Sequence, residues 1–359
     1  MNGWMLALAL AVLCALQRLL IASFGMKGLQ YKRQFSRKSA FEGEKGELIE
    51  VIRNDRPLLI PWLRAESRIS PCLKFGRQEN LQVSGERYHK SLFMLAPFQQ
   101  ITRKHIVSFT LRGAYDVGNV TLTLGDLLGE CGTGAELRTK AEILVYPRLL
   151  SPEEMPLPVS RLQGEWTVKR HWQSDPFLIN GIREYRAGDP VRDIHWPATA
   201  RMNALQVKTH DYTADTKLLI LLNGQMTENQ WGDLMDYEQA LIERAISISA
   251  TLCVQGLKQG MAVGFGANMP VGGEDAPALF LPSCYPGREE ELLSAFARLR
   301  IKRCRSFLTF LGDLSSVSGA DILILSAYDS PDIQEKMGLL RRLGNTVTLY
   351  RLDREAQEP

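Results

Sequence analysis

The sequence lacks closely spaced cysteines. Its six cysteines lie far apart and form no C-x-x-C pair: Cys14, Cys72, Cys131, Cys253, Cys284 and Cys304. Because structural zinc sites and thioredoxin-like redox motifs need such pairs, the sequence argues against both. Cys14 and Cys253 stand in apolar runs, where a reduced thiol packs as a small hydrophobic group. This pattern is typical of a reducing compartment.

Catalytic sequence motifs are also missing. There is no G-x-x-x-x-G-K-[ST] loop, no H-E-x-x-H motif and no G-x-S-x-G nucleophile elbow. His89, His105, His171 and His210 are isolated, and we interpret each as a surface or packing residue rather than a metal ligand. The formal net charge is only +3, which gives no reason to expect nucleic-acid binding. We therefore expect no enzymatic activity, cofactor, metal or small-molecule substrate.

The N-terminus is strongly apolar. Trp4–Leu16 is an unbroken apolar run, and Leu19–Phe24 continues it after Gln17 and Arg18. As a helix, these roughly 21 positions would span about 31 Å, enough to cross a bilayer. The sequence therefore predicts a transmembrane helix over residues 1–26. A cleaved signal peptide fits less well, because no basic residue precedes the run and no small-x-small site ends it. A buried core helix remains an alternative.

Basic residues follow the apolar run, and no charged side chain precedes it. The five are Lys27, Lys32, Arg33, Arg37 and Lys38. The positive-inside rule then predicts a single pass with the C-terminal part in the cytoplasm. The same charges are also typical of a solvated stalk, and the two interpretations are compatible because basic flanks attract anionic lipid.

The rest of the chain divides into three predicted segments. Residues 27–150 contain short alternating runs such as Glu47–Arg53, which predict an antiparallel β-sandwich. Residues 151–212 form a proline-containing linker and then a charged segment. In residues 213–359, buried-type strands such as Lys217–Leu222 alternate with helical patterns, one of them capped by Asp236 and ending near Gln259. That alternation predicts an α/β domain with a mostly parallel sheet.

The charged segment carries the most specific pattern in the chain. It reads G-I-R-E-Y-R-A-G-D-P-V-R-D-I-H-W from position 181, with Ala-Arg at 200–201. Its candidate functional residues are Arg183, Glu184, Tyr185, Gly188, Asp189, Arg192, His195, Trp196 and Arg201.

This pattern resembles the hallmark G-x-R-E-Y-x-x-G-D-x-x-R-x-I-H-W, followed by A-R, of the bacterial family called domain of unknown function 58 (DUF58). The sequences at 112–115 (R-G-A-Y) and 145–147 (V-Y-P) resemble further markers of the family. The resemblance implies that residues 213–359 form a von Willebrand A-like (Rossmann-like) α/β domain. It also implies a bacterial inner-membrane location and a MoxR-type AAA+ ATPase as partner.

Three interpretations of the charged segment stay open. Its four arginines could form bidentate ion pairs with Glu184, Asp189 or Asp193 in a structural network. The segment could instead be a docking surface for a partner. In the third interpretation, His195 is an acid–base group oriented by Asp189 or Asp193, and the protein is a hydrolase.

A divalent-cation site is expected to be degenerate. Von Willebrand A domains often bind Mg²⁺ through D-x-S-x-S after the first strand, because carboxylate and hydroxyl oxygens are hard ligands. The corresponding positions hold Asn223, Gln225 and Thr227, and a later strand end offers Asp329. Loss of the anionic ligand should weaken binding, so we expect a metal-free, protein-binding domain. A cation-dependent adhesion domain is the weakest alternative.

Together these patterns predict a membrane-anchored protein-binding and assembly module. Its expected partners are a MoxR-type AAA+ ATPase, through the resemblance, and membrane lipid, through the N-terminal segment.

Overall fold

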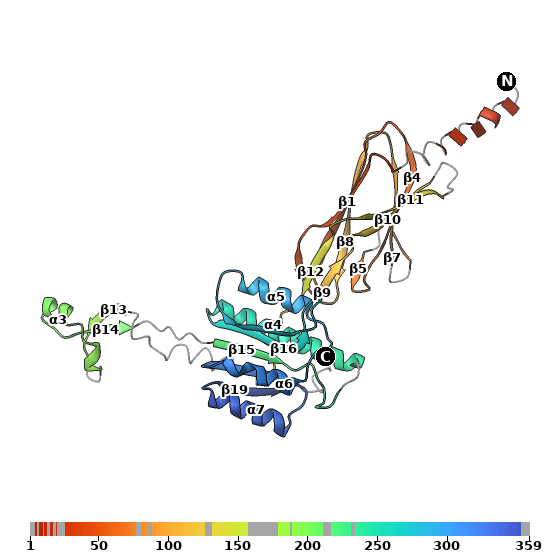
Figure 1. Cartoon of the computed structure of the whole chain (residues 1–359). Helices are drawn as coiled ribbons and strands as arrows, with labels where there is room; N and C mark the ends of the chain where they lie inside the picture. Colours follow the sequence, from red (N-terminus) through yellow and green to blue (C-terminus); the bar gives the residue numbers. More distant parts are fainter. Residues whose placement is uncertain are drawn as a thin grey trace. The chain divides into compact units, whose positions relative to one another are not determined.

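The structure is a computed structural model of the 359-residue chain. It describes residues 4–5, 7–9, 11–12, 15–16, 19, 26–76, 81–84, 88–125, 131–156, 179–186, 189–210, 217–230 and 234–352. The chain divides into two compact units, Met1–Arg148 and Leu149–Pro359 (Figure 1). Each unit has its own sheets.

The first unit is built from mainly antiparallel sheets. One has the strand order β1 (Leu29–Phe35), β3 (Lys45–Asn54), β8 (Gln100–Phe109) and β5 (Leu73–Phe75). A second has the order β11 (Cys131–Arg138), β10 (Asn119–Gly125), β4 (Ile60–Arg68), β7 (Tyr88–Leu95) and β6 (Leu81–Ser84). A third joins β2 (Ser39–Phe41), β12 (Glu142–Tyr146) and β9 (Gly113–Asp116).

The first two sheets pack face to face as a sandwich. Alternate residues along β3, such as Leu48, Glu50 and Ile52, are buried because successive side chains of a strand point to opposite faces. Ile52 packs with Leu63 of β4 and Phe93 of β7 in one apolar cluster that joins both sheets. Burial of these alternating side chains is the main favourable contribution to this unit.

The second unit contains a five-stranded sheet with the order β17 (Pro277–Ser283), β16 (Ala262–Pro270), β15 (Lys217–Leu222), β18 (Ala320–Ser326) and β19 (Thr346–Arg351). All neighbours are parallel except β16 and β17. Helices α4 (Asp236–Lys258) and α5 (Arg288–Arg298) cover one face (Figure 1). Helices α6 (Phe307–Gly312) and α7 (Pro331–Arg342) cover the other, and the turn η3 (Asp313–Ser316) follows α6.

The central strand β15 is a continuous apolar run. Five of its six residues are buried, because helices lie on both faces of the sheet and leave no solvent-facing side.

The N-cap of helix α4 lies one residue earlier than the sequence predicted. Met235, not Asp236, is the N-cap, and its backbone N–H donates to Glu238 Oε2 at 2.9 Å. The helix ends at Lys258, and Gly260 follows with a φ of 75°.

The charged segment forms a small substructure of its own. Strands β13 (Ile179–Glu184) and β14 (Gln206–His210) pair antiparallel, with Arg183 opposite Val207. Between them lie the short turn η2 (Val191–Asp193) and helix α3 (Trp196–Met202). Ile194 forms an isolated bridge to Val207, so the connecting chain folds back onto the hairpin.

The predicted fold class is wrong. We expected a von Willebrand A-like α/β domain preceded by one sandwich and an N-terminal transmembrane helix. Of the five sheets in the described part of the chain, four are antiparallel apart from the single parallel pair β2–β12. The described part of the chain is therefore mostly sandwich-like antiparallel sheet, and the mostly parallel five-stranded sheet of the second unit is one of five.

The predicted N-terminal transmembrane helix is wrong as well. Between residues 4 and 19, the longest helical run among the described positions is Ala7–Ala9. Among the described residues, the helix that has the length and hydropathy to cross a membrane is instead α4, in the middle of the chain, and about two thirds of its apolar window is buried. Packing against β15, β16 and α5 accounts for that apolarity, so α4 is weak support for membrane association.

Candidate functional site

A bidentate ion pair organises the charged segment. Arg183 Nη1 and Nη2 donate to Asp189 Oδ2 and Oδ1, both at 2.7 Å. Asp189 also accepts a hydrogen bond from the backbone N–H of Arg186 at 2.8 Å. The bonds from Arg183 and Arg186 hold the pKa of Asp189 at about 2. Asp189 is therefore ionised at neutral pH and closes the turn after β13. Gly188, another candidate residue of this segment, lies outside the described residues.

His195 serves as a helix cap. Its Nδ1 accepts a hydrogen bond from the backbone N–H of Ala198 at 3.0 Å, at the start of α3. The acidic residues that were expected to orient it have other contacts: Asp189 binds Arg183, and Asp193 lies 3.9 Å from Arg192. Nδ1 of His195 is therefore used by the start of α3, and the Asp189 carboxylate is used by Arg183.

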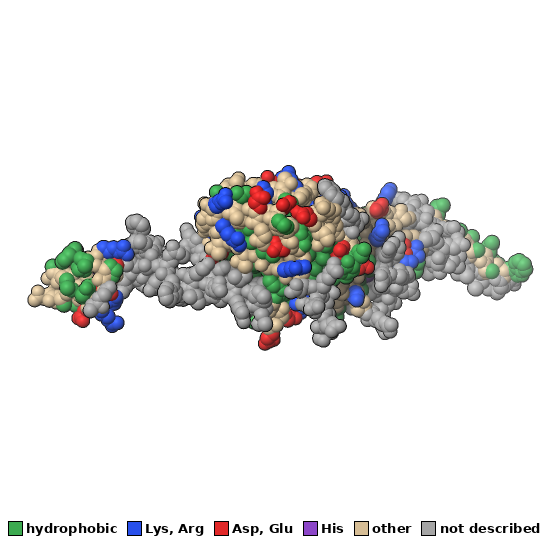
Figure 2. All heavy atoms as spheres, turned by 90° about the horizontal axis from the view of Figure 1, so that it is seen from below, with side chains coloured by type: hydrophobic (Ala, Val, Ile, Leu, Met, Phe, Trp, Pro, Cys, Tyr) green, Lys and Arg blue, Asp and Glu red, His purple; other side chains and the backbone are tan. Residues whose placement is uncertain are grey.

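Apolar side chains of this segment face solvent. The exposed ones are Ile182, Val191, Trp196, Met202 and Leu205, and Trp196 is 63% exposed. Figure 2 shows hydrophobic side chains gathered on the part of the molecule that holds β13, β14 and α3, with Lys and Arg beside them. Glu184, Arg192 and Arg201 are exposed, while Tyr185 is half-buried and its backbone N–H donates to Leu205 O. The substructure thus combines a fixed internal frame with an uncovered apolar and charged surface.

The predicted metal-site positions at the ends of β15 and β18 form an amide network. Asn223 is fully buried; its Nδ2 donates to Ser326 Oγ at 3.0 Å, and its Oδ1 accepts from Gln225 N at 3.0 Å. Gln225 Oε1 accepts from Phe307 N at 2.8 Å and from Asn268 Nδ2 at 3.3 Å. The oxygen atoms that a cation would need are therefore already hydrogen-bonded to N–H groups.

The other two predicted positions are exposed. The carbonyl of Thr227 accepts from Gln230 N at 3.3 Å and from Gln225 Nε2 at 3.5 Å. Asp329 is exposed, and its carboxylate accepts from Gln334 Nε2 at 2.9 and 2.8 Å. The Asn223 side chain bonds to Ser326 and Gln225, and the Asp329 carboxylate bonds to Gln334, so these contacts do not form a cation ligand set from the four positions.

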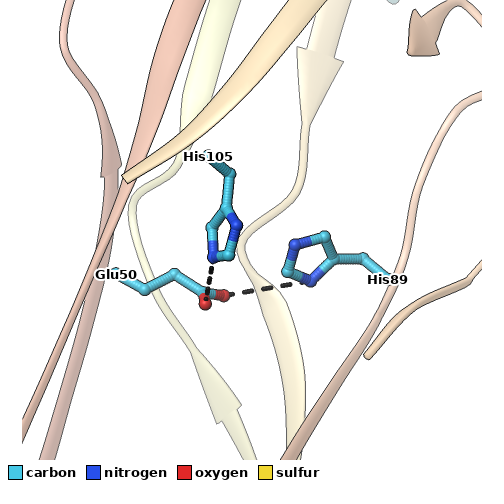
Figure 3. Close-up of side chains that lie close together, drawn as sticks. All are labelled: Glu50, His89 and His105. Atoms are coloured by element: carbon cyan, nitrogen blue, oxygen red, sulfur yellow. Dashed lines mark hydrogen bonds and ion pairs between the residues drawn. The ribbon is translucent and has the colours of Figure 1, made fainter. Parts of the chain in front are cut away.

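A charged cluster that the sequence interpretation missed is buried in the sandwich. Glu50 of β3 lies against two histidines, His89 of β7 and His105 of β8 (Figure 3). His105 Nε2 is 2.8 Å from Glu50 Oε2, and His89 Nδ1 is 3.9 Å from Glu50 Oε1. All three side chains are buried.

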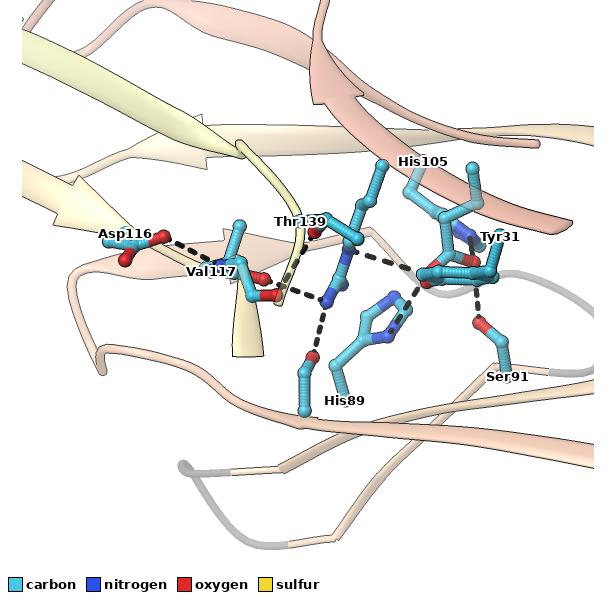
Figure 4. Close-up of polar contacts among 11 residues, drawn as sticks. Tyr31, His89, Ser91, His105, Asp116, Val117 and Thr139 are labelled. Atoms are coloured by element: carbon cyan, nitrogen blue, oxygen red, sulfur yellow. Dashed lines mark hydrogen bonds and ion pairs between the residues drawn. The ribbon is translucent and has the colours of Figure 1, made fainter. Parts of the chain in front are cut away.

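Hydrogen-bond donors from both sheets surround the Glu50 carboxylate. Tyr31 OH donates at 2.8 Å and Ser91 Oγ at 2.9 Å (Figure 4). Arg33 Nε lies 3.4 Å away, and Arg33 Nη1 donates to Ser67 Oγ at 2.5 Å. Tyr31 and Arg33 belong to one sheet of the sandwich, and Ser67 and Ser91 to the other. The cluster therefore connects the two sheets through polar contacts.

Electrostatics fix the charge state of this cluster. Burial alone would raise the pKa of Glu50, but the hydrogen bond from His105 and the positive charge of Arg33 outweigh it, so the pKa lies well below its usual range. Burial and the nearby Arg33 lower the pKa of His89 to about 3. Glu50 is therefore ionised and His89 neutral at physiological pH.

Glu50, His89 and His105 are the one group of carboxylate, thiol or imidazole ligands within metal-binding reach in the described part of the chain. Their donor atoms suit Zn²⁺ by type, with two imidazoles and one carboxylate. However, the Arg33 guanidinium already neutralises Glu50, and a dication placed there would stand beside a buried positive charge. The surroundings therefore favour a structural ion pair over a metal centre.

Comparisons with known proteins support one family assignment. The profile of the family described as "Protein of unknown function DUF58" matches residues 181–282, from β13 through β16 into β17. The match covers less than a third of the chain and supports the DUF58 family over that segment. No curated protein sequence matches the chain.

Several solved structures are similar to part of the chain. The CARDB domain of the PF1109 protein from Pyrococcus furiosus, solved in complex with di-metal ions, is 15% identical over 33% of this chain and 92% of its own, with a TM-score of 0.21. Alpha-2-macroglobulin from Escherichia coli is 10% identical over 33% of this chain and 23% of its own (TM-score 0.26). The seventh ScaB type I cohesin from Pseudobacteroides cellulosolvens is 13% identical over 35% and 95% (TM-score 0.21). Scores this low do not establish a shared fold.

Proposed function

We propose that this chain is a membrane-associated protein-binding module, and that its partner docks on the substructure formed by residues 179–210. The observation that carries the proposal is the contrast within that substructure. Arg183 and Asp189 satisfy each other in a bidentate pair, whereas Trp196 and Met202 remain exposed. Large exposed apolar side chains on a fixed frame are the anchors that protein interfaces use.

The proposed partner is a MoxR-type AAA+ ATPase. The support for this choice is the resemblance of the 181–201 pattern to the DUF58 family, together with the profile match over 181–282. The exposed Arg192 and Arg201 favour a partner surface with acidic groups, because complementary charge speeds encounter and fixes orientation.

Co-expression and pull-down of the full-length chain with a MoxR-type ATPase tests this proposal. We expect Trp196→Ala to weaken retention of the ATPase at least tenfold, as loss of a central aromatic anchor does. The matched control is Leu281→Ser, which removes a comparably exposed apolar side chain from β17 of the same unit and should leave retention unchanged. A folded wild-type chain that retains no ATPase would contradict the proposed partner.

Membrane association is the second part of the proposal. The described N-terminal side chains are apolar and exposed, among them Trp4, Leu8, Val12 and Leu19. Exposed apolar side chains of this kind mark a surface that contacts lipid or another protein. We propose that they contact the bacterial inner membrane, with the chain after residue 26 on the cytoplasmic side. Cys284 is an exposed free cysteine that reports on this orientation. A membrane-impermeant maleimide should label it in inverted vesicles but not in intact spheroplasts, and the Cys284→Ser chain gives the background.

The contacts of His195, Asp189 and Asn223 favour neither the hydrolase nor the cation-dependent adhesion alternative. His195 caps a helix, Asp189 binds Arg183, and Asn223 is hydrogen-bonded to other amide and hydroxyl groups. We therefore propose neither as a second function.

A further inference from the structure

One end of the sandwich collects three short segments: Met26–Gly28 before β1, Arg53–Leu59 around the β3–β4 connection, and Ala96–Gln99 between β7 and β8. Backbone bonds tie them together. Asp55 N donates to Gly28 O at 3.1 Å, and Phe98 N donates to Arg56 O at 3.1 Å. The buried Asn54 side chain also joins the last two segments, because its Nδ2 donates to both Leu58 O and Ala96 O. We call this end of the first unit the loop end.

Two apolar side chains at the loop end, Leu59 and Phe98, are exposed to solvent, and Phe98 is 68% exposed. The neighbouring side chains of Met26, Leu29 and Leu58 pack instead against the sandwich core. Core packing therefore does not explain why position 98 holds phenylalanine, a large hydrophobic residue.

The backbone holds Phe98 in an unfavourable conformation. Its φ is +55°, in the left-handed region that bulky residues seldom adopt. Hydrogen bonds fix the turn around it: Phe98 N donates to Arg56 O, and Ala96 N donates to Gln99 Oε1 at 2.7 Å. A strained residue that the surroundings hold in place, and whose side chain is left in solvent, is a frequent feature of ligand-contacting loops.

The loop end is basic. The charged residues of its three segments are Lys27, Arg53, Arg56 and Asp55, which sum to +2; Lys27 and Arg53 are exposed, and Arg56 is half-buried. Asp55 is already bound by Arg53 at 2.5 Å and by Gln30 at 2.8 Å. Exposed apolar groups surrounded by basic residues are the composition that anionic bilayer surfaces attract, with apolar side chains entering the interface and cations contacting the headgroups.

The position of the apolar N-terminal sequence selects lipid over other occupants. The run Trp4–Phe24 ends two residues before Met26, and Met26 is itself part of the loop end. A lipid-associated N-terminal sequence would therefore hold Phe98 close to the headgroups, whatever partner binds elsewhere. We propose that the loop end is a second lipid contact, in which Phe98 and Leu59 enter the interface of an anionic bilayer while the exposed Lys27 and Arg53 face the headgroups. This inference rests on the membrane association proposed above.

Site-specific photo-crosslinking tests the proposal on the full-length chain in nanodiscs of phosphatidylglycerol and phosphatidylcholine. A benzophenone-bearing phenylalanine analogue replaces Phe98 in one variant and Leu111 in a matched control. Leu111 is also exposed, but it follows the far end of β8, about 30 Å away at ~3.3 Å per residue. We expect lipid adducts, identified by mass, several times more often at position 98 than at position 111, and more often with phosphatidylglycerol than with phosphatidylcholine alone.

A third variant carries the analogue at Trp4 and separates the two proposals. Lipid adducts at position 4 without adducts at position 98 would overturn the lipid contact of the loop end and leave membrane association standing. Absence of adducts at both positions would overturn both. Equal yields at 98 and 111, or a protein adduct at 98 in place of a lipid adduct, would also overturn the proposed contact.

Discussion

Each unit of this protein buries a polar cluster, and different interactions offset the desolvation free energy of the two clusters. In the sandwich, the ionised Glu50 lies among Tyr31, Ser91, His105 and the cation Arg33. At the strand ends of the second unit, uncharged amide and hydroxyl groups of Asn223, Gln225, Asn268 and Ser326 bond to one another and to the backbone. One cluster depends on charge balance and the other only on hydrogen-bond matching.

This difference determines how each cluster responds to change. A buried charge that loses its counter-ion cannot be rehydrated, so removal of one partner is costly. A neutral amide network loses only individual hydrogen bonds, each of smaller value. The charged cluster should also respond to pH, whereas amides do not titrate in the physiological range.

The largest expected effect is that of Glu50→Gln. The substitution preserves shape but leaves Arg33 buried without its carboxylate, and we expect the free energy of unfolding of the first unit to fall by about 3–5 kcal/mol. Urea unfolding followed by circular dichroism measures it. The control is Glu47→Gln on the same strand, an exposed pair with Lys104 worth about 0–1 kcal/mol. Equal losses for the two variants would mean that Glu50 is not the counter-ion of Arg33.

A smaller loss is expected for Asn268→Ala in the second unit. Asn268 Oδ1 accepts from Gly224 N at 2.7 Å, and its Nδ2 donates to Arg305 O at 3.2 Å. Leaving these buried groups without a partner should cost about 1–3 kcal/mol in the same unfolding experiment. Gln334→Ala, which removes an exposed amide, is the control and should change little. A loss for Asn268→Ala as large as that of Glu50→Gln would remove the distinction between the clusters.

The third effect appears only on acidification. The unfolded chain protonates His89 near pH 6.5, whereas the folded chain, with a His89 pKa of about 3, does so only near pH 3. The unfolded state thus binds more protons between these values, and stability falls as pH falls through that window. The lowered pKa of Glu50 acts in the same direction below its ordinary value near 4.5. Melting temperatures from pH 7 to 4 should fall, and less steeply for His89→Gln; an unchanged slope would exclude His89 as the cause.

The smallest effect is expected for Asp329→Ala. The carboxylate is exposed and bonds to Gln334, so its loss should change stability by no more than about 0.5 kcal/mol. The melting temperature of the wild-type chain should not respond to Mg²⁺. A Mg²⁺-dependent rise that Asp329→Ala abolishes would show instead that this end of the sheet binds a cation.

The buried position of Glu50 could have been predicted, but its partners could not. In strand β3, buried and exposed residues alternate, and Glu50 lies between Leu48 and Ile52 on the inward face. This alternation predicts that the Glu50 side chain is buried. Its partners Arg33, His89 and His105 come from three other strands. Sequence spacing carries no information on such pairing, and this is why the two histidines were interpreted as isolated residues.

The second unit shows which signals were reliable. The strands and helices expected after Lys217 are present, because buried runs such as Lys217–Leu222 and the long apolar face of α4 are strong local patterns. The overall fold class was still wrong, because most of the described sheets are antiparallel and no helical run longer than Ala7–Ala9 is found among the described N-terminal positions. In the charged segment, residue types alone did not distinguish a helix cap at His195 from an acid–base group, because both need a free imidazole nitrogen.

The cap at His195 has a consequence for recognition. An imidazole that accepts the Ala198 N–H through Nδ1 must carry its own hydrogen on Nε2 while it is neutral. The ring can then offer an approaching molecule a proton donor but no lone pair. Any group that recognises this side chain must therefore be an acceptor, such as a carbonyl or carboxylate oxygen, and a metal ion could coordinate Nε2 only after the start of α3 gave up its cap.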